Sequence, residues 1–137
     1  MKIYIDATNL PLGRIGTFTA RKVLTGDEVY ILNCEDAIIS GNKKDVLERI
    51  TNLRNKGGNS LKGPKIPRPA PRLLKRLIRG MLPWDKQRGR DAYKKIKCYG
   101  KNEFDSSKIE FTKLDARLPQ KYMKLSEVSK LIWFQKI

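Results

Sequence analysis

Residues 62–97 read KGPKIPRPAPRLLKRLIRGMLPWDKQRGRDAYKKIK, and the rest of the chain is organised around them. This stretch holds thirteen Lys and Arg residues and two acids, a net charge of +11 out of +16 for the chain. Residues 1–61 add +2 and residues 98–137 add +3. Charge concentrated in one segment favours binding of a polyanion, because each neutralised phosphate releases condensed counterions.

The middle of this stretch, residues 72–81, predicts a helix with two different faces. At 100° per residue, four basic residues fall within an arc of about 100° and five apolar residues within an opposite arc of about 140°. One face can pack on a core while the other presents a row of cations. A solvated surface helix and a membrane-surface helix are the alternatives, and the apolar face lacks the Trp or Phe typical of the latter. The basic residues are Arg72, Lys75, Arg76 and Arg79, and the apolar ones are Leu73, Leu74, Leu77, Ile78 and Met81.

Length and composition fit a single nucleic-acid-binding domain over residues 1–137, with a basic Pro-rich arm at 56–71 and a C-terminal extension at 118–137. The pI near 10.1 is typical of nucleic-acid binders. No apolar run is long enough to span a bilayer and the N-terminus does not resemble a signal peptide, so we expect a cytoplasmic protein. There is no histidine, and Cys34 and Cys98 are isolated, so we expect no metal, no cofactor and reduced thiols in a core.

Hydrophobic periodicity alternates between strands and helices. The strand at 28–33 is apolar on both faces, as in the centre of a covered sheet. This order predicts an α/β fold, three-layer α/β/α, with a small mostly parallel sheet of about four strands. Strands are expected at 2–7, 28–33, 37–39 and 96–99, an extended run at 111–115, an irregular arm at 118–124, and helices at 13–24, 42–55, 72–81, 85–95 and from 126 onward.

The Pro-rich arm and the first helix each carry a second hypothesis. Four prolines in residues 64–71 favour an extended path that is disordered without RNA, or a protein-recognition module. Gly13 and Gly16 open the first helix, where free N–H groups could bind a phosphate; with Asp6 they could form the site of a small nucleotide-binding enzyme. The dinucleotide and Walker fingerprints are absent, and the glycines could instead serve helix packing. The sequence also lacks a histidine for general acid–base catalysis and the Gly-x-Ser-x-Gly motif of a nucleophile elbow, so catalysis has little support.

Trp84 is followed by Lys86, Arg88 and Arg90. Its ring could stack on an RNA base or pack in the core. Gly89, between the two arginines, would allow close approach of the backbone to a ligand.

Three separated groups of residues resemble the large-subunit ribosomal protein L13 family: IDAT at 5–8 with LGR at 12–14, ISGN at 39–42, and RGMLP at 79–83 with RG at 88–89, Ala92 and IKCY at 96–99. The resemblance implies an α/β/α protein of the large ribosomal subunit that binds rRNA and is engaged early in assembly. The helix that leads into the Pro-rich arm and the tail at 122–137 depart from bacterial members and are similar to the archaeal or eukaryotic branch.

We therefore expect a non-catalytic structural protein whose partners are large-subunit rRNA and neighbouring large-subunit ribosomal proteins, with no membrane and no small-molecule substrate. Backbone phosphates should dominate the contacts. The expected RNA-binding residues are Arg68, Arg72, Lys75, Arg76, Arg79, Trp84, Lys86, Arg88 and Arg90, with Arg14, Lys62 and Lys65 as secondary contacts.

Overall fold

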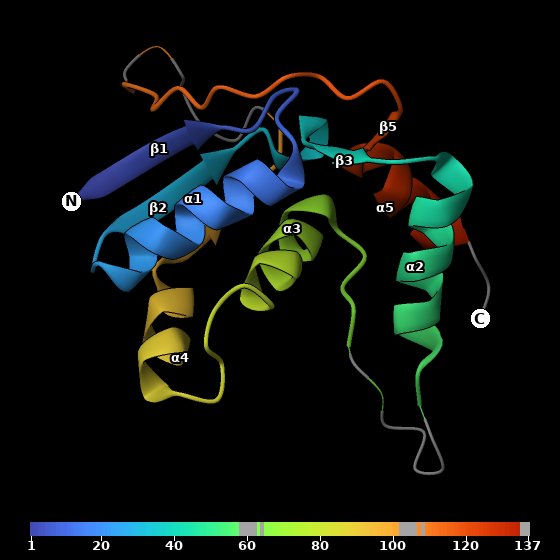
Figure 1. The fold of residues 1–137 in the computed structure, drawn as a ribbon, viewed down its shortest axis with the longest axis horizontal. Coiled ribbons are helices and arrows are strands. Elements are labelled where there is room, and N and C mark those ends of the chain that lie inside the picture. The colour runs from blue at the N-terminus through green and yellow to red at the C-terminus, as the bar shows by residue number, and fades with distance from the viewer. Residues whose placement is uncertain (58–62, 64, 102–106, 108, 135–137) are drawn as a thin grey trace.

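The fold is described from a computed structural model, over residues 1–57, 63, 65–101, 107 and 109–134. Strands β1 (Lys2–Asp6), β2 (Glu28–Leu32) and β4 (Ile96–Cys98) form a parallel sheet in the order β1-β2-β4 (Figure 1). The central strand β2 is buried on both faces from its second residue onward, as its unbroken apolar sequence predicts. The α/β class and the small, mostly parallel sheet are therefore confirmed.

A second, antiparallel pair consists of β3 (Ile38–Ser40) and β5 (Tyr122–Lys124). Residues 122–124 lie in the segment for which the sequence predicts only an irregular arm. They become a strand because the chain returns to β3 from far along the sequence, with Ile39 opposite Met123. A three-residue strand defined by such a distant partner leaves little periodicity for sequence analysis to detect.

Five helices surround the strands: α1 (Leu12–Leu24), α2 (Lys43–Asn55), α3 (Ala70–Arg79), α4 (Gln87–Lys94) and α5 (Leu125–Phe134), with a short 3-10 turn η1 (Cys34–Asp36). Helix α3 begins and ends two residues before the expected range 72–81. It starts early because Pro71 fits in the first turn, where no N–H is needed, and it ends at Gly80. Helix α4 begins two residues after the expected start at 85, and Lys86 precedes it without a side-chain hydrogen bond.

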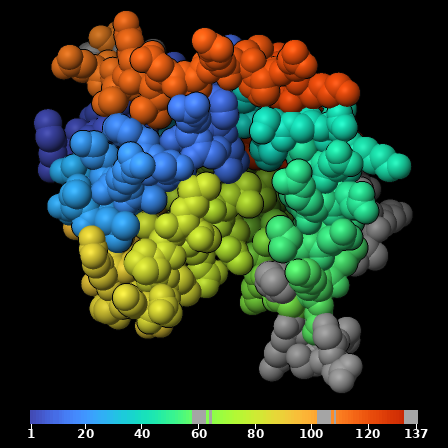
Figure 2. All heavy atoms as spheres, viewed as in Figure 1, coloured from blue at the N-terminus to red at the C-terminus, as the bar shows by residue number. Residues whose placement is uncertain are grey.

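Helix α3 occupies the middle of the molecule, in contact with α1, α5, η1 and β4 (Figure 1). In the space-filling view the yellow-green atoms of the α3 region fill the space between α1 and α2 (Figure 2). Leu73, Leu74 and Ile78 are fully buried, so the predicted apolar face is confirmed there. Leu77 is only half-buried, and Met81 lies beyond the helix end and is 42% exposed, so the buried arc is narrower than predicted.

The C-terminal helix α5 packs on α3 and η1. Val128 and Ile132 are buried in this contact, whereas Leu131 is exposed. Upstream of α3, the Oγ of Ser129 donates a hydrogen bond to the carbonyl oxygen of Arg68 at 2.7 Å. This contact joins the described end of the Pro-rich arm to α5; residues 58–62 and 64 of the predicted arm lie outside the described residues.

Candidate nucleic-acid interface

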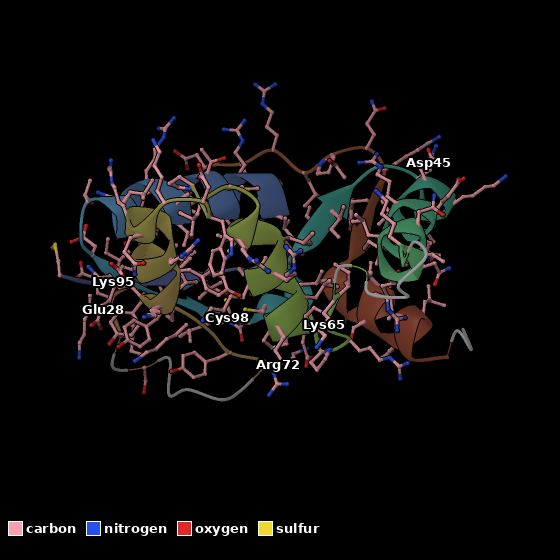
Figure 3. All side chains as sticks on the ribbon, turned by 90° about the horizontal axis from the view of Figure 1, so that it is seen from below. Glu28, Asp45, Lys65, Arg72, Lys95 and Cys98 are labelled. Carbon is pink, nitrogen blue, oxygen red and sulfur yellow. The ribbon has the colours of Figure 1, made fainter. Side chains whose placement is uncertain are left out.

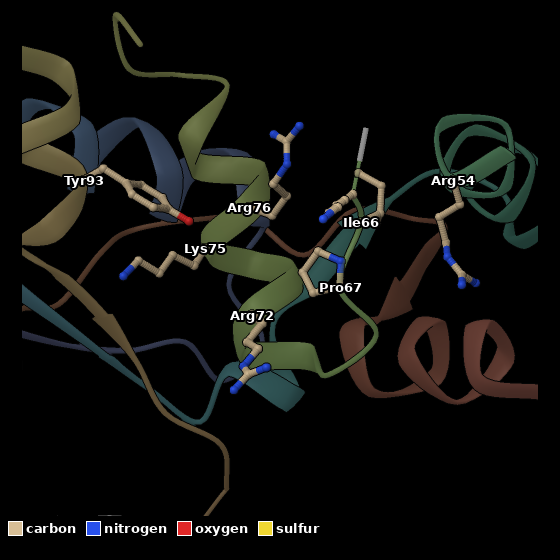
Figure 4. A pocket seen from close by; sticks show the side chains of 8 residues that line it. Arg54, Ile66, Pro67, Arg72, Lys75, Arg76 and Tyr93 are labelled. Atoms are coloured by element: carbon tan, nitrogen blue, oxygen red, sulfur yellow. The ribbon is translucent and has the colours of Figure 1, made fainter. Parts of the chain in front are cut away.

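A hollow of about 560 Å³ lies over the outward face of α3 (Figure 4). Lys75 and Tyr93 lie on one side of the helix, and Ile66 and Pro67 on the other. Three separate parts of the chain meet here: α2, residues 65–67 with α3, and α4. The lining residues are Arg54, Lys65, Ile66, Pro67, Arg72, Lys75, Arg76 and Tyr93.

The hollow is strongly cationic. Five of its eight lining residues are Arg or Lys and none is acidic. The ion pairs found among the described residues involve other cations, such as Lys43 with Glu127 and Lys94 with Asp91. Gathering cations without carboxylate partners costs free energy unless an anion neutralises them, so the arrangement suits a polyanionic ligand.

Burial acts on two of these cations. Desolvation lowers the pKa of Lys75, with the neighbouring Lys97 charge adding to the effect and Cys98 opposing it. Desolvation, followed by the charge of Arg68, also lowers the pKa of Arg54. The Nη1 of Arg54 donates a hydrogen bond to the carbonyl oxygen of Ile132 at 3.3 Å, which anchors this side chain between α2 and α5.

Two aromatic rings hold the cations beside the hollow. The Lys75 ammonium lies 4.7 Å from the centre of the Tyr93 ring. Tyr93 meets Trp84 edge-on with 5.1 Å between ring centres, and the Arg79 guanidinium covers the Trp84 ring at 4.0 Å. Burial raises the pKa of the Tyr93 hydroxyl, an effect that Arg79 opposes and Cys98 reinforces. The rings thus limit the conformations that Lys75 and Arg79 can adopt.

Of the predicted RNA-binding residues, Lys65, Arg72, Lys75 and Arg76 line the hollow. Viewed from below, Lys65 and Arg72 lie on the same side of the molecule (Figure 3). The remaining predicted residues flank the hollow or lie elsewhere, as follows.

Trp84 contacts Tyr93, which lines the hollow, and Arg79 covers the Trp84 ring. Both residues therefore lie beside the hollow. Lys86, Arg88 and Arg90 are exposed at the start of α4, and the Nε of Arg90 donates to the carbonyl oxygen of Trp84 at 2.9 Å. The Trp84 ring is half-buried, and Arg79 covers a ring face on which a base was expected to stack.

Arg14 lies apart from the others, in a second hollow of about 640 Å³ that also contains Arg21 and Asp115. Arg68 does not line the first hollow, although its charge acts on Arg54. Lys62 lies outside the described residues.

Sequence analysis missed Arg54 and the role of Tyr93. Arg54 lies in α2, a helix of mixed charge within the part of the chain whose net charge is only +2. Tyr93 lies in α4 and is half-buried. No local signal separates Arg54 from the exposed Arg49 of the same helix, because only the folded chain brings one of them to α3.

The glycine turn at 13–16 is not arranged as a nucleotide site. Gly16 is buried against the side chains of Met81 and Ile78, which leaves only Gly13 beside the second hollow. Burial alone would raise the pKa of Asp6, but hydrogen bonds from Asn33 and Thr8 bring it below its ordinary value. These hydrogen bonds hold the Asp6 carboxylate against the turn after β1.

Gly89 also serves packing within the protein. A Cβ at this position would overlap the carbonyl oxygen of Pro83. The close approach that the sequence suggested for a ligand is therefore made by the chain itself.

The described residues contain no cluster of three or more His, Cys, Asp or Glu suited to a metal ion. Cys34 is buried and Cys98 half-buried, and the two are not joined by a disulfide. In the same part of the chain, no helix combines the length and apolar character needed to cross a membrane.

Comparison with known proteins gives a consistent result. Residues 1–105 match the family model described as Ribosomal protein L13. Three similar proteins are all named large ribosomal subunit protein uL13. The protein of Methanosarcina barkeri is 41% identical over 131 residues, 91% of this chain and 93% of the relative. The protein of Archaeoglobus fulgidus is 36% identical over 137 residues, which are 96% of this chain and 87% of the relative. The protein of Picrophilus torridus is 35% identical over 133 residues, which are 95% of this chain and 96% of the relative.

Proposed function

This chain belongs to the ribosomal protein L13 family, and on that premise we propose that it is a structural constituent of the large ribosomal subunit that binds large-subunit rRNA and supports subunit assembly. Its partners are components of the ribosome, with rRNA as the direct ligand and neighbouring large-subunit proteins around it. We place it with the ribosome in the cytoplasm and assign it no catalytic activity.

The observation that carries this proposal is the cationic hollow over α3. Its five Lys and Arg residues come from three parts of the chain and have no acidic residue among them. Several fixed cations on one concave surface match the closely spaced phosphates of folded RNA.

The proposed contact surface has a centre and an extension. Arg54, Lys65, Arg72, Lys75 and Arg76 form the centre, since they share the hollow. Arg79 and the exposed Lys86, Arg88 and Arg90 extend it along α4. Lys62 and Arg68 in the arm and Arg14 on α1 are proposed as outer contacts.

Two arginines of one helix provide a matched test. We would measure the affinity of the purified chain for a large-subunit rRNA transcript over a range of salt concentrations. Arg54→Gln should weaken binding and reduce the slope of log affinity against log salt by about 0.9, the value for one lost phosphate contact. Arg49→Gln, an exposed change on the same helix outside the hollow, should leave the slope unchanged. Equal slopes for wild type and Arg54→Gln would remove the hollow from the proposed site.

A further inference from the structure

We propose that the hollow over α3 receives a single unpaired nucleotide of the RNA, rather than only touching the backbone of a duplex. The inference rests on the proposed function and specifies the ligand of the same site. It concerns the shape and chemistry of the lining, which go beyond the charge that any RNA requires.

The shape favours one small group. The hollow measures about 560 Å³, within the range of roughly 300–1,000 Å³ that is usual for sites of small-molecule ligands. An A-form duplex presents a broad convex surface, and proteins contact it across its minor groove and phosphates. A nucleotide turned out of the stack is small enough to enter a depression of this volume.

The lining combines two kinds of surface. Arg72, Lys75 and Arg76 come from α3, whereas Ile66, Pro67 and Tyr93 form its apolar and aromatic part on either side of that helix (Figure 4). Phosphates gain nothing from an apolar wall, which would displace their water without replacing it. An unpaired base does gain, because its faces are apolar and its phosphate reaches the cations beside it.

Two polar groups lie beside the wall, and one of them, the Tyr93 hydroxyl, can donate to such a ligand. The Nε of Arg76 is buried, and it has no hydrogen-bond acceptor in the described part of the protein. The Tyr93 hydroxyl points toward α3 and, with its raised pKa, keeps its proton at neutral pH. A base carbonyl or a sugar oxygen that enters the hollow could accept from the hydroxyl.

The surroundings also leave a path for the nucleotides on either side. A smaller hollow of about 260 Å³ adjoins the first and shares Arg72 and Lys75 with it. Lys97 and Cys98 line its far side. The strand that carries the inserted nucleotide can therefore continue past α3 toward β4 while remaining beside cations.

The test compares three RNA hairpins with the same stem of about 16 base pairs, the length contacted by a typical duplex-binding domain. The first is fully paired, the second carries one bulged uridine, and the third carries an abasic ribose at the bulge. We expect the full-length protein to bind the uridine bulge roughly 10-fold more tightly than the paired stem, as one stacked base contributes. The abasic bulge should lose most of that gain.

Variants connect the preference to this hollow. Ile66→Ala and Pro67→Ala should each reduce the preference for the uridine bulge while leaving the salt slope unchanged, since no cation is lost. Leu114→Ala is the control, because Leu114 is also half-buried against the core but lines the hollow around Arg14. The comparison of the three hairpins with wild-type protein does not depend on any variant folding.

The outcomes separate this inference from the function on which it rests. If the paired and bulged hairpins bind equally with a steep salt slope, the nucleotide site is wrong while rRNA binding stands. A uridine preference that Ile66→Ala and Pro67→Ala leave intact also overturns the assignment to this hollow. If neither the hairpins nor the rRNA transcript binds, both proposals fail.

Discussion

The guanidinium of Arg79 lies over the indole ring of Trp84, with 4.0 Å between its central carbon and the ring centre. Four residues lie between the two in sequence, and the turn after α3 folds Trp84 back beneath the last residue of that helix. The contact uses a ring face that a base would otherwise occupy. It makes Trp84 primarily a residue that positions Arg79.

We expect the contact between Arg79 and Trp84 to appear as an interaction energy. A double-mutant cycle with Arg79→Gln and Trp84→Leu, measured by urea unfolding, should give a coupling of about 0.5–1 kcal/mol, as for a partly exposed cation–π pair. Arg72→Gln with Trp84→Leu is the control pair, because Arg72 points into the hollow elsewhere on α3. If both pairs are additive, the stacked geometry does not persist in solution.

The two faces of α3 should fail in different ways. Leu74 is fully buried, so Leu74→Ala should lower the free energy of unfolding by about 2–5 kcal/mol. Leu77→Ala should cost less, since Leu77 is half-buried. The exposed Arg72 changed to Gln should leave the unfolding midpoint nearly unchanged and reduce the salt slope of RNA binding by roughly 0.7–0.9. Unfolding by Arg72→Gln with no loss in Leu74→Ala would mean that the faces are assigned in reverse.

Two buried glycines should respond differently to an added methyl group. In Gly16→Ala the Cβ would lie 2.5 Å from the Sδ of Met81, the end of a flexible and partly exposed side chain that can move aside. In Gly89→Ala the Cβ would overlap the backbone of Pro83, which cannot move aside as a flexible side chain can. Thermal unfolding should therefore show Gly16→Ala close to wild type and Gly89→Ala less stable by about 1–3 kcal/mol or more. Similar stability of the two variants would contradict the packing of α4 on the preceding turn.

The raised pKa of Tyr93 predicts a loss of stability at alkaline pH. The folded protein holds this proton above the ordinary pKa of 10.0, so the contribution of Tyr93 is complete below about pH 10 and is lost as pH rises through the folded-state pKa. Tyr93→Phe should flatten the fall in the free energy of unfolding as the pH rises above about 10. Tyr122→Phe, at an exposed position on β5, serves as the control. An unchanged pH dependence in Tyr93→Phe would show that the hydroxyl is hydrated rather than buried.

The hypothesis of a nucleotide-binding enzyme predicts tight binding of a nucleotide, whereas our proposal predicts none. We expect no saturable binding of ATP or a dinucleotide at physiological salt beyond weak anion binding, because Gly16 is packed under Met81 and Asp6 is bonded to Thr8 and Asn33. Isothermal titration calorimetry in two salt concentrations would measure this. A micromolar affinity that persists at high salt would revive a nucleotide site around Gly13.

Local patterns in the sequence determined most elements of the fold. The apolar run of β2 predicted a central strand, and the spacing of Leu73, Leu74 and Ile78 predicted the buried side of α3. Such patterns suffice because burial acts on residues two, three or four positions apart, whichever partner covers them. Three of the predicted contact residues, Arg72, Lys75 and Arg76, also share one hollow, since one helix face is a local property.

Tertiary structure alone decided the rest. Strand β5 exists because β3 lies beside it, and Arg54 joins the hollow because α2 packs near the C-terminal helix, where Ile132 accepts its hydrogen bond. The same folding turned Gly89 toward Pro83 and covered Trp84 with Arg79. The first two features depend on contacts between segments far apart in the sequence. The last two depend on the path of the turn between α3 and α4, which hydrophobic periodicity does not reveal. The charge of the surface was therefore a property of the sequence, while its concave shape, with an apolar wall facing the cations, arose only when three distant segments met over α3.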